Sequence, residues 1–318
     1  MTNTVNAQAQ AQAGKMNEYG RFEPWHFGTS LEGITSVQDA MQKADLAWEV
    51  NQAKAYIQDE NGNFIETPAV VNYRSDNGLY LGTVTDRYQK VNNFEAFSFL
   101  DVFQNYSFVS GGVVNGGKTA WVCVEVQGFD VLGDTVKQYY IFSNTHDGSG
   151  SLRVCLTPVR AVCSNTLNLA LKKATRAFSL RHKGDTEGKL MMIGDILRHD
   201  KEYQHEFIEQ SERLALLKVS DYAVDKMLMS LFPYDREKDT DRKIRNMTEQ
   251  QDAVKHCYKA DDLGNFYGTA YGFINAVSDM AYHSTPKRMT TTYRENQMLS
   301  VIKGNKLLDK ALTLVDNL

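Results

Sequence analysis

Apolar and polar residues change their spacing along the first part of the chain. Over residues 35–52 the apolar positions recur every three or four residues, and Ser36 stands three residues before Asp39, as in a helix capping box. Strand-like alternation follows at residues 55–57, 63–65, 69–74 and 78–84, with turn sequences between these segments. The pattern predicts one helix followed by an antiparallel meander.

The middle of the chain predicts a short helix and then more strands. Asn92 can cap a helix that runs to Leu100. Residues 106–142 return to strand spacing, and the sequence Asn-Gly-Gly-Lys at 115–118 inside them is a strong hairpin signal. Helical spacing then dominates four segments, at residues 189–230, 247–259, 266–283 and 293–317.

These elements place the chain in the α+β class. We expect an antiparallel sheet with helices packed on one side, followed by a helical C-terminal region. Residues 1–18, rich in Ala, Gln and Asn, predict a flexible tail, and residues 19–230 an α+β body. A charged linker loop at 231–246 is expected to separate this body from a helical region over 247–318.

Charge is distributed unevenly along the sequence. The chain has a formal net charge of −4, yet seven Lys or Arg and no Asp or Glu lie between Gly148 and Gly184, so the remainder sums to −11. A basic block in an acidic protein indicates a local anionic partner. A helix predicted over residues 165–180 sets Lys172 and Arg176 on one face, opposite an apolar stripe.

This block predicts a surface for single-stranded nucleic acid. Its cations would contact phosphates, and nearby tyrosines would stack on bases for about 1–3 kcal/mol each. The predicted phosphate-contacting residues are Arg153, Arg160, Lys172, Lys173, Arg176, Arg181 and Lys183. The predicted stacking residues are Tyr80, Tyr88, Tyr139 and Tyr140. A solvated helix face and ordinary sheet tyrosines account for the same residues.

The turn at residues 146–149, His-Asp-Gly-Ser, is the candidate for catalysis. Adjacent His146 and Asp147 point apart in a turn, so a general base here needs an orienting group from elsewhere. Cys163, just ahead of the predicted helix, is the candidate nucleophile. However, a Cys in a run of Val and Ala is usually a small buried side chain, and backbone geometry explains an Asp-Gly turn. We therefore predict no catalytic residue.

Signatures of metal, triphosphate and membrane binding are missing from the sequence. The four cysteines have no CxxC spacing, and neither an HExxH motif nor a G-x4-GK[ST] loop is present. The first residues have no basic region or apolar core of a secretion signal, and no apolar run approaches the ~18 residues that span a bilayer. We expect no metal, no cofactor, no membrane contact and a reduced, cytoplasmic environment.

Several phrases of the sequence resemble one protein family. Residues 81–88, LGTVTDRY, and 93–97, NFEAF, resemble the LGxVxxxY and NxEAF signature of the phage/plasmid-like family, a domain of unknown function. Residues 145–149 and 157–167 are similar to its HDGS and TxVRxVCxNTL phrases. Trp48-Glu49-Val50 fits its W-x-V phrase, and Arg181-His182 its RHT or RHS phrase, with Lys183 replacing the small hydroxyl residue. The likeness covers residues 40–185, and 262–310 more loosely.

The resemblance implies a gene of phages, plasmids and their bacterial hosts, and it supplies no catalytic residues. With the basic block, it favours a non-catalytic DNA-binding protein that acts as a homo-oligomer in the bacterial cytoplasm. It would bind single-stranded DNA, and anneal it, during replication or recombination. Two alternatives remain open: a hydrolase or nucleic-acid-modifying enzyme with a site near His146, Asp147 and Cys163, and a scaffold or inhibitor that binds a host protein.

Overall fold

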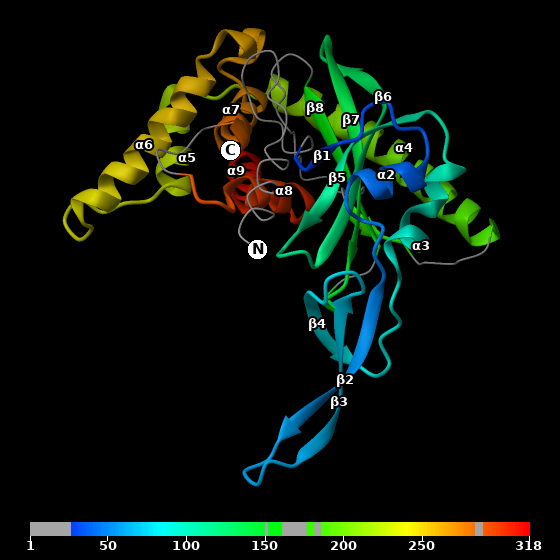
Figure 1. The fold of residues 1–318 in the computed structure, drawn as a ribbon. Helices are drawn as coiled ribbons and strands as arrows, with labels where there is room; N and C mark the ends of the chain where they lie inside the picture. Colours follow the sequence, from blue (N-terminus) through cyan, green and yellow to red (C-terminus); the bar gives the residue numbers. More distant parts are fainter. Residues whose placement is uncertain (1–26, 150–151, 161–176, 181–185, 284–288) are drawn as a thin grey trace.

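The computed structural model of the chain has an α+β fold (Figure 1). It describes residues 27–149, 152–160, 177–180, 186–283 and 289–318. Strands fill the first half of the described sequence and helices the second, so the predicted class and the helical C-terminal region are confirmed.

The larger sheet has six antiparallel strands in the order β1-β5-β6-β7-β8-β9. The strands are β1 (Thr29–Ser30), β5 (Tyr106–Val114), β6 (Thr119–Val131), β7 (Asp134–Thr145), β8 (Arg153–Arg160) and β9 (Ala177–Ser179). The predicted turn at 115–118 joins β5 to β6, and Asn115, Gly116 and Gly117 all have positive φ. The helix predicted over 165–180 is wrong at its end, because Ala177 pairs with Cys155 as part of β9. Residues 161–176 lie outside the described part.

The smaller sheet has three antiparallel strands in the order β2-β3-β4. They are β2 (Val50–Gln58), β3 (Phe64–Arg74) and β4 (Tyr80–Thr85). The hairpin between β2 and β3 was predicted, but the segments 63–65 and 69–74 form one long strand. The helix expected over 35–52 ends at Lys43, and Asp45 takes a positive φ of 54°. Pairing of Val50 with Arg74 then extends the chain as β2, so tertiary contacts override the local helical spacing.

The remaining elements are helical, and the segments predicted at 189–230 and 293–317 each form two helices. They are α2 (Val37–Lys43), α3 (Asn93–Phe97), η2 (Ser98–Asp101), α4 (Thr186–Leu216), α5 (Asp221–Leu231), α6 (Asp241–Tyr258), η3 (Asp261–Phe266), α7 (Ala270–His283), α8 (Tyr293–Lys303) and α9 (Lys306–Asp316). The loop expected at 231–246 is shorter, because Thr240 caps α6: its hydroxyl oxygen accepts a hydrogen bond from the Lys243 backbone N–H.

Helices contact both faces of the six-stranded sheet, whereas we expected them on one side. On one face Phe142 packs edge-on against Phe99 of η2, with ring centres 5.2 Å apart. On the other face the Cys155 Sγ lies 3.3 Å from the carbonyl oxygen of Val301 in α8. The central strands explain this, because residues 139–142 of β7 are apolar at consecutive positions and are all buried. One hydrophobic cluster extends from Phe27 to Val315 and includes both the sheet and the C-terminal helices.

Arg160, at the end of β8, lies inside this core. Its side chain is 2% exposed and forms an ion pair with Asp134, to which the Nε donates at 2.8 Å. Its Nη1 donates to the Oδ1 of Asn275 in α7 at 3.3 Å, and the guanidinium lies 5.3 Å from the ring centre of Phe266. Arg160 therefore ties α7 to the sheet and does not reach a phosphate in solvent, contrary to the expectation from its charge.

Two of the tyrosines predicted to stack on bases are also interior residues. Tyr139 is 2% and Tyr140 is 1% exposed. Tyr140 packs beside Phe142 and Phe103, with ring centres 6.1 and 6.2 Å away. Neither ring has a free face for a base. The strand spacing that placed them in a sheet did not reveal that helices cover that sheet on both faces.

We expect Arg160→Ala to lower the free energy of unfolding by roughly 3–5 kcal/mol, because Asp134 and Asn275 lose their buried partner. Urea denaturation followed by far-UV circular dichroism measures the change. Arg198→Ala is the matched control, because the Arg198–Asp195 pair on α4 is exposed, at 62% and 48%, and should contribute less than about 1 kcal/mol. Equal losses for the two variants would contradict the structural role of Arg160.

Candidate functional site

A buried histidine lies where the two sheets meet. His146 follows β7 directly and is 1% exposed. Its Nε2 lies 2.8 Å from the Oδ1 of Asn93, in the first turn of α3. Its backbone N–H donates to the Lys118 carbonyl at 2.9 Å, and its own carbonyl accepts a 2.8 Å bond from the Nδ2 of Asn72 in β3. His146 therefore joins the start of β6, α3 and the small sheet.

Trp48 and Arg74 complete this junction. The Trp48 ring meets His146 edge-on, with centres 5.2 Å apart, and the Arg74 guanidinium lies 4.5 Å from the centre of the same ring. Arg74 is also paired with Asp45 at 3.2 Å and with Asp76 at 2.7 Å. Arg74 thus stacks on the indole that contacts the imidazole, and the whole cluster links β2 and β3 to the larger sheet.

Two glycines allow β4 to lie directly against the turn that contains His146. A Cβ on Gly82 would stand 2.5 Å from the Cα of Asp147. Gly148 has a φ of +82°, and a Cβ there would stand 2.8 Å from the Cγ1 of Val84. The LGTV segment of β4 and the HDGS turn are therefore in contact and admit no larger side chain at these two positions.

A polar pocket of about 440 Å³ opens beside the HDGS turn. The ends of β6, β7, β8 and β9 form its base, and α8 contributes Leu299 and Ile302 to its wall. Two cations, Arg153 and Lys303, also line it. We call it the hydroxyl pocket because of the five hydroxyl side chains it contains, those of Thr119, Ser143, Thr145, Ser149 and Ser179.

Strand register brings these side chains together. Ser143 pairs with Arg153, and Arg153 pairs with Ser179, so a single row crosses three strands. Thr119 pairs with Thr145 at the end of the sheet, where their Oγ1 atoms lie 3.1 Å apart. Directly opposed residues of antiparallel strands project to the same face. The polar face thus continues around Arg153, which is half-buried, toward the exposed Lys303 in the last turn of α8.

One carboxylate lies close to the hydroxyl pocket. Burial tends to raise the pKa of Asp147, but hydrogen bonds from Ser149 and the charges of Lys118 and Lys303 outweigh this effect and lower it. The Asp147 side chain accepts from the Ser149 N–H at 2.8 Å, which holds the turn. Asp147 is therefore ionised near pH 7, and Lys118, Lys303 and Arg153 together give the region a net positive charge.

Two of the predicted tyrosines border this region. The Lys118 Nζ lies 5.6 Å from the ring centre of Tyr80, which is 50% exposed. Tyr88 donates to the Thr145 carbonyl at 3.5 Å, and burial, reinforced by the Asp147 charge, raises its pKa. Tyr80 therefore keeps an accessible ring next to a cation, whereas Tyr88 supports the strand end that carries Thr145.

Comparison with known proteins connects this site to a family. The family model described as "Domain of unknown function (DUF932)" matches residues 80–302, which is more than two thirds of the chain. The chain belongs to the DUF932 family. No curated protein and no solved structure matches it.

The DUF932 match includes the HDGS turn and every residue of the hydroxyl pocket except Lys303, which follows the last matched residue. It begins at Tyr80, so Trp48, on which part of the resemblance rested, precedes it. It also runs without a break through α4, α5 and α6, which the resemblance did not cover. The match thus runs from β4 into α8, while β1, α2, the β2–β3 hairpin and α9 lie outside the matched residues.

The residues predicted for phosphate binding have different positions. Arg153 lines the hydroxyl pocket, and Arg160 is in the core. The other five lie outside the described residues: Lys172, Lys173, Arg176, Arg181 and Lys183. Cys163 lies outside them as well. Lys118, Lys303 and the hydroxyl row were not predicted from the sequence. Alternation of Ser143 and Thr145 at the end of an apolar strand was the available signal for that row, but nothing in the sequence placed Lys303 beside it.

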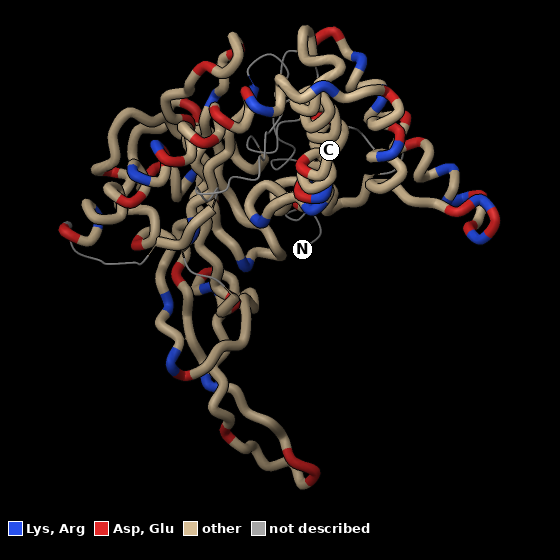
Figure 2. The backbone as a smooth tube through the Cα atoms, turned by 180° about the vertical axis from the view of Figure 1, so that it is seen from behind, with Lys and Arg blue, Asp and Glu red and all other residues tan. Residues whose placement is uncertain are grey.

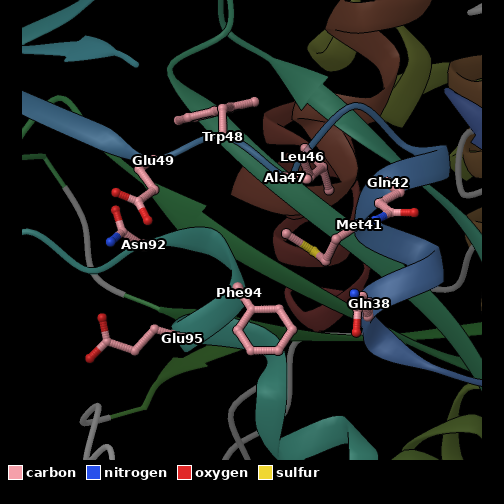
Figure 3. Close-up of a pocket in the computed structure, with 10 residues that line it drawn as sticks. All are labelled: Gln38, Met41, Gln42, Leu46, Ala47, Trp48, Glu49, Asn92, Phe94 and Glu95. Atoms are coloured by element: carbon pink, nitrogen blue, oxygen red, sulfur yellow. The ribbon is translucent and has the colours of Figure 1, made fainter. Parts of the chain in front are cut away.

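A second pocket of about 440 Å³ lies between α2 and α3 (Figure 3). Met41 and Leu46 give it an apolar side, and the ring of Phe94, which is 51% exposed, lies across from them (Figure 3). The carboxylates of Glu49 and Glu95 also line it. Its charge is opposite to that of the hydroxyl pocket, so it does not suit a phosphate ligand.

The described part of the chain has neither a metal-binding cluster nor a membrane-spanning helix. There, His, Cys, Asp and Glu side chains form no cluster of three or more suited to a metal ion. No described helix has both the length and the apolar character needed to cross a membrane.

His146 should make the stability of the protein depend on pH. Burial lowers its pKa to about 4, from 6.5 in the unfolded chain. Below pH 6.5 His146 is protonated in the unfolded chain but stays neutral in the folded protein. Stability therefore falls as the pH falls from 6.5 toward 4. We expect this group alone to account for a loss of about 2 kcal/mol between pH 7.5 and pH 5.

Urea denaturation of His146→Gln at both pH values checks this expectation. The variant should be less stable than the wild type by about 1–3 kcal/mol at pH 7.5, because the ring contact with Trp48 is lost, and the difference should shrink at pH 5. His205→Gln is the control, because His205 is exposed on α4 and its replacement removes no buried ring. A difference between His146→Gln and wild type that stays constant with pH would disprove the assignment.

Proposed function

We propose that this DUF932 chain is a non-catalytic protein that binds single-stranded DNA, and that the hydroxyl pocket receives a phosphate of the strand. The observation that carries the proposal is the meeting of Arg153 and Lys303 with five hydroxyl groups at one end of the sheet. Arginine, lysine and hydroxyl side chains are the groups that proteins use to hold phosphate oxygens. They gather here in a protein whose net charge is −4, so the attraction is local.

The surroundings of the pocket extend the proposal to a nucleotide chain. A volume of about 440 Å³ is that of a small-ligand site, large enough for one nucleotide unit. The exposed ring of Tyr80 offers a stacking surface for a base, and Lys118 lies over that ring. Stacking on tyrosine accepts any base, so little sequence preference is expected.

The biological setting is part of the same proposal. The resemblance of the LGTVTDRY and HDGS segments to a phage/plasmid-like family supports a role in phage or plasmid replication or recombination, in the bacterial cytoplasm. Annealing of complementary strands requires that two strands be brought together, which a homo-oligomer achieves with one pocket in each copy. The binding step does not depend on this assembly.

An enzyme built on His146 and Asp147 has less support. His146 is buried, its Nε2 is engaged with Asn93, and its lowered pKa keeps it neutral. Asp147 accepts hydrogen bonds from its own turn. Both residues are accounted for by the contacts that hold the junction, and Cys163 lies outside the described residues.

Fluorescence anisotropy with a labelled single-stranded oligonucleotide tests the proposal. We expect Arg153→Gln and Lys303→Gln each to weaken binding roughly tenfold at about 50 mM salt, because each removes a phosphate contact. Each should also reduce the slope of log K against log salt by about 0.7. Tyr80→Ala should weaken binding by about 1–3 kcal/mol with the slope unchanged, since it removes stacking and no charge.

The control for these variants is Lys238→Gln. Lys238 is 81% exposed and pairs with Asp235 in the loop before α6, away from the pocket, so both affinity and slope should remain those of the wild type. Absence of binding at about 50 mM salt, or equal effects of Lys238→Gln and Arg153→Gln, would reject the nucleic-acid function.

A further inference from the structure

The β2–β3 hairpin projects from the body as a long arm (Figure 1). Strand β4 pairs with β3 only from Ala69 onward, so the outer part of the arm is a ribbon of two strands. Four large apolar side chains on it are about half or more exposed: Tyr56 (52%), Ile57 (57%), Phe64 (74%) and Ile65 (49%). Two-stranded ribbons are marginally stable alone, and exposed apolar groups of this kind mark interaction surfaces.

The outer edge of β2 lacks most of the features that keep edge strands from pairing. Residues 52–58, QAKAYIQ, contain no Pro and no Gly, and one charge. That charge, on Lys54, is bound to Glu66 of the same arm at 2.5 Å. The irregularity in the arm lies in β3, where Thr67, Pro68 and Ala69 stand opposite the single Ala55, so the outer edge of β2 stays regular.

The open edge also has a definite length and midpoint. At its inner end Val50 is already engaged: its N–H donates to the Asn92 Oδ1 at 3.0 Å, and its carbonyl accepts from the Lys90 Nζ at 2.7 Å. At its outer end the strand stops at Gln58. Within the described residues no other strand pairs with this edge. The free edge is therefore residues 52–58, with Ala55 at its centre.

We propose that the β2 edge pairs antiparallel with the β2 edge of a second copy of this chain, about a two-fold axis at Ala55. In this register Lys54 lies opposite Tyr56 of the other copy, and Ala53 lies opposite Ile57, so no like charges face each other. Such an isologous contact joins two arms into one four-stranded sheet and uses the same residues on both copies.

Charges at the ends of the arm agree with this register. Asp59 and Glu60 make the tip acidic (Figure 2), and the register carries them to residues 51 and 50 of the other copy. Lys90 lies at residue 50, because its Nζ donates to the Val50 carbonyl, so the acidic tip of one copy comes next to Lys90 of the other. Glu49 immediately precedes Val50 in the sequence. The acidic tip also excludes nucleic acid as the occupant of the arm, so this surface is distinct from the hydroxyl pocket and the dimer does not depend on DNA binding.

Cysteine cross-linking of the full chain tests the axis directly. In Ala55→Cys the two Cα atoms across the axis are about 4.5–5.5 Å apart, within disulfide range, so air oxidation should yield a covalent dimer. In Ala53→Cys each introduced cysteine lies opposite Ile57 of the other copy. The two cysteines are then about four positions apart along the strands, roughly 13 Å, and should form no disulfide-linked dimer. The wild type controls for its own cysteines. Equal cross-linking by both variants, or none by Ala55→Cys, would overturn the proposal.

Charge pairs test the register without a covalent bond. Ala53 and Ile57 are both exposed, so substitutions there spare the fold, which circular dichroism checks. Sedimentation velocity should show the wild type as a dimer at micromolar concentration. In the double variant Ala53→Glu/Ile57→Glu, the glutamate at 53 of each copy lies opposite the glutamate at 57 of the other. These two like-charge pairs should weaken the dimer about tenfold or more. Ala53→Glu/Ile57→Lys should restore it.

The remaining outcomes separate this partner from others. A monomeric wild type shows that the arm does not pair with its own copy and rejects the proposal. A dimer that Ala53→Glu/Ile57→Glu leaves intact places the contact elsewhere and rejects it as well. DNA binding by the monomeric double-glutamate variant would leave the function of the hydroxyl pocket supported, so the two proposals fail independently.

Discussion

The contact between His146 and Asn93 lies at the centre of the junction between the two sheets. An imidazole can be buried at low cost only if it is neutral and its polar atoms have partners. Here the Nε2 has Asn93, the backbone groups have Lys118 and Asn72, and the ring lies against Trp48. Those partners come from separate segments of the chain, so one residue fixes the small sheet, α3 and the start of β6 to the end of β7.

The hydroxyl pocket depends on this junction. Thr145, Gly148 and Ser149 line the pocket and flank His146 in sequence. Gly82 and Gly148 let β4 lie against the same turn, and Tyr80 at the start of β4 contacts Lys118, the neighbour in sequence of the pocket residue Thr119. A protein that lost the junction would keep much of its core, which extends far from it, yet would lose the alignment of the groups proposed to hold a phosphate and a base.

Arg153 and Arg160 show how one strand can give two arginines opposite roles. They stand at the two ends of β8. Arg153 pairs across to Ser143 and Ser179 and keeps part of its side chain in solvent. Arg160 ends in an ion pair with Asp134 beneath α7. The pocket and the β2–β3 arm are likewise distinct, because the first is basic and polar, whereas the second is apolar with an acidic tip. The two surfaces proposed to bind an anion and another chain are thus separate.

The sequence by itself determined the α+β class, the β2–β3 hairpin, the turn at 115–118 and the C-terminal helices, because these follow from the local spacing of apolar residues and from turn residues. It also picked out the HDGS turn and Arg153. Only the tertiary structure decided that Val50 extends a strand, that Ala177 pairs with Cys155, and that Arg160, Tyr139 and Tyr140 are buried. The physical reason is that strand pairing and burial join residues far apart in the chain: Lys303 reaches the hydroxyls of β6 and β7 through the packing of α8, and no local pattern encodes that contact.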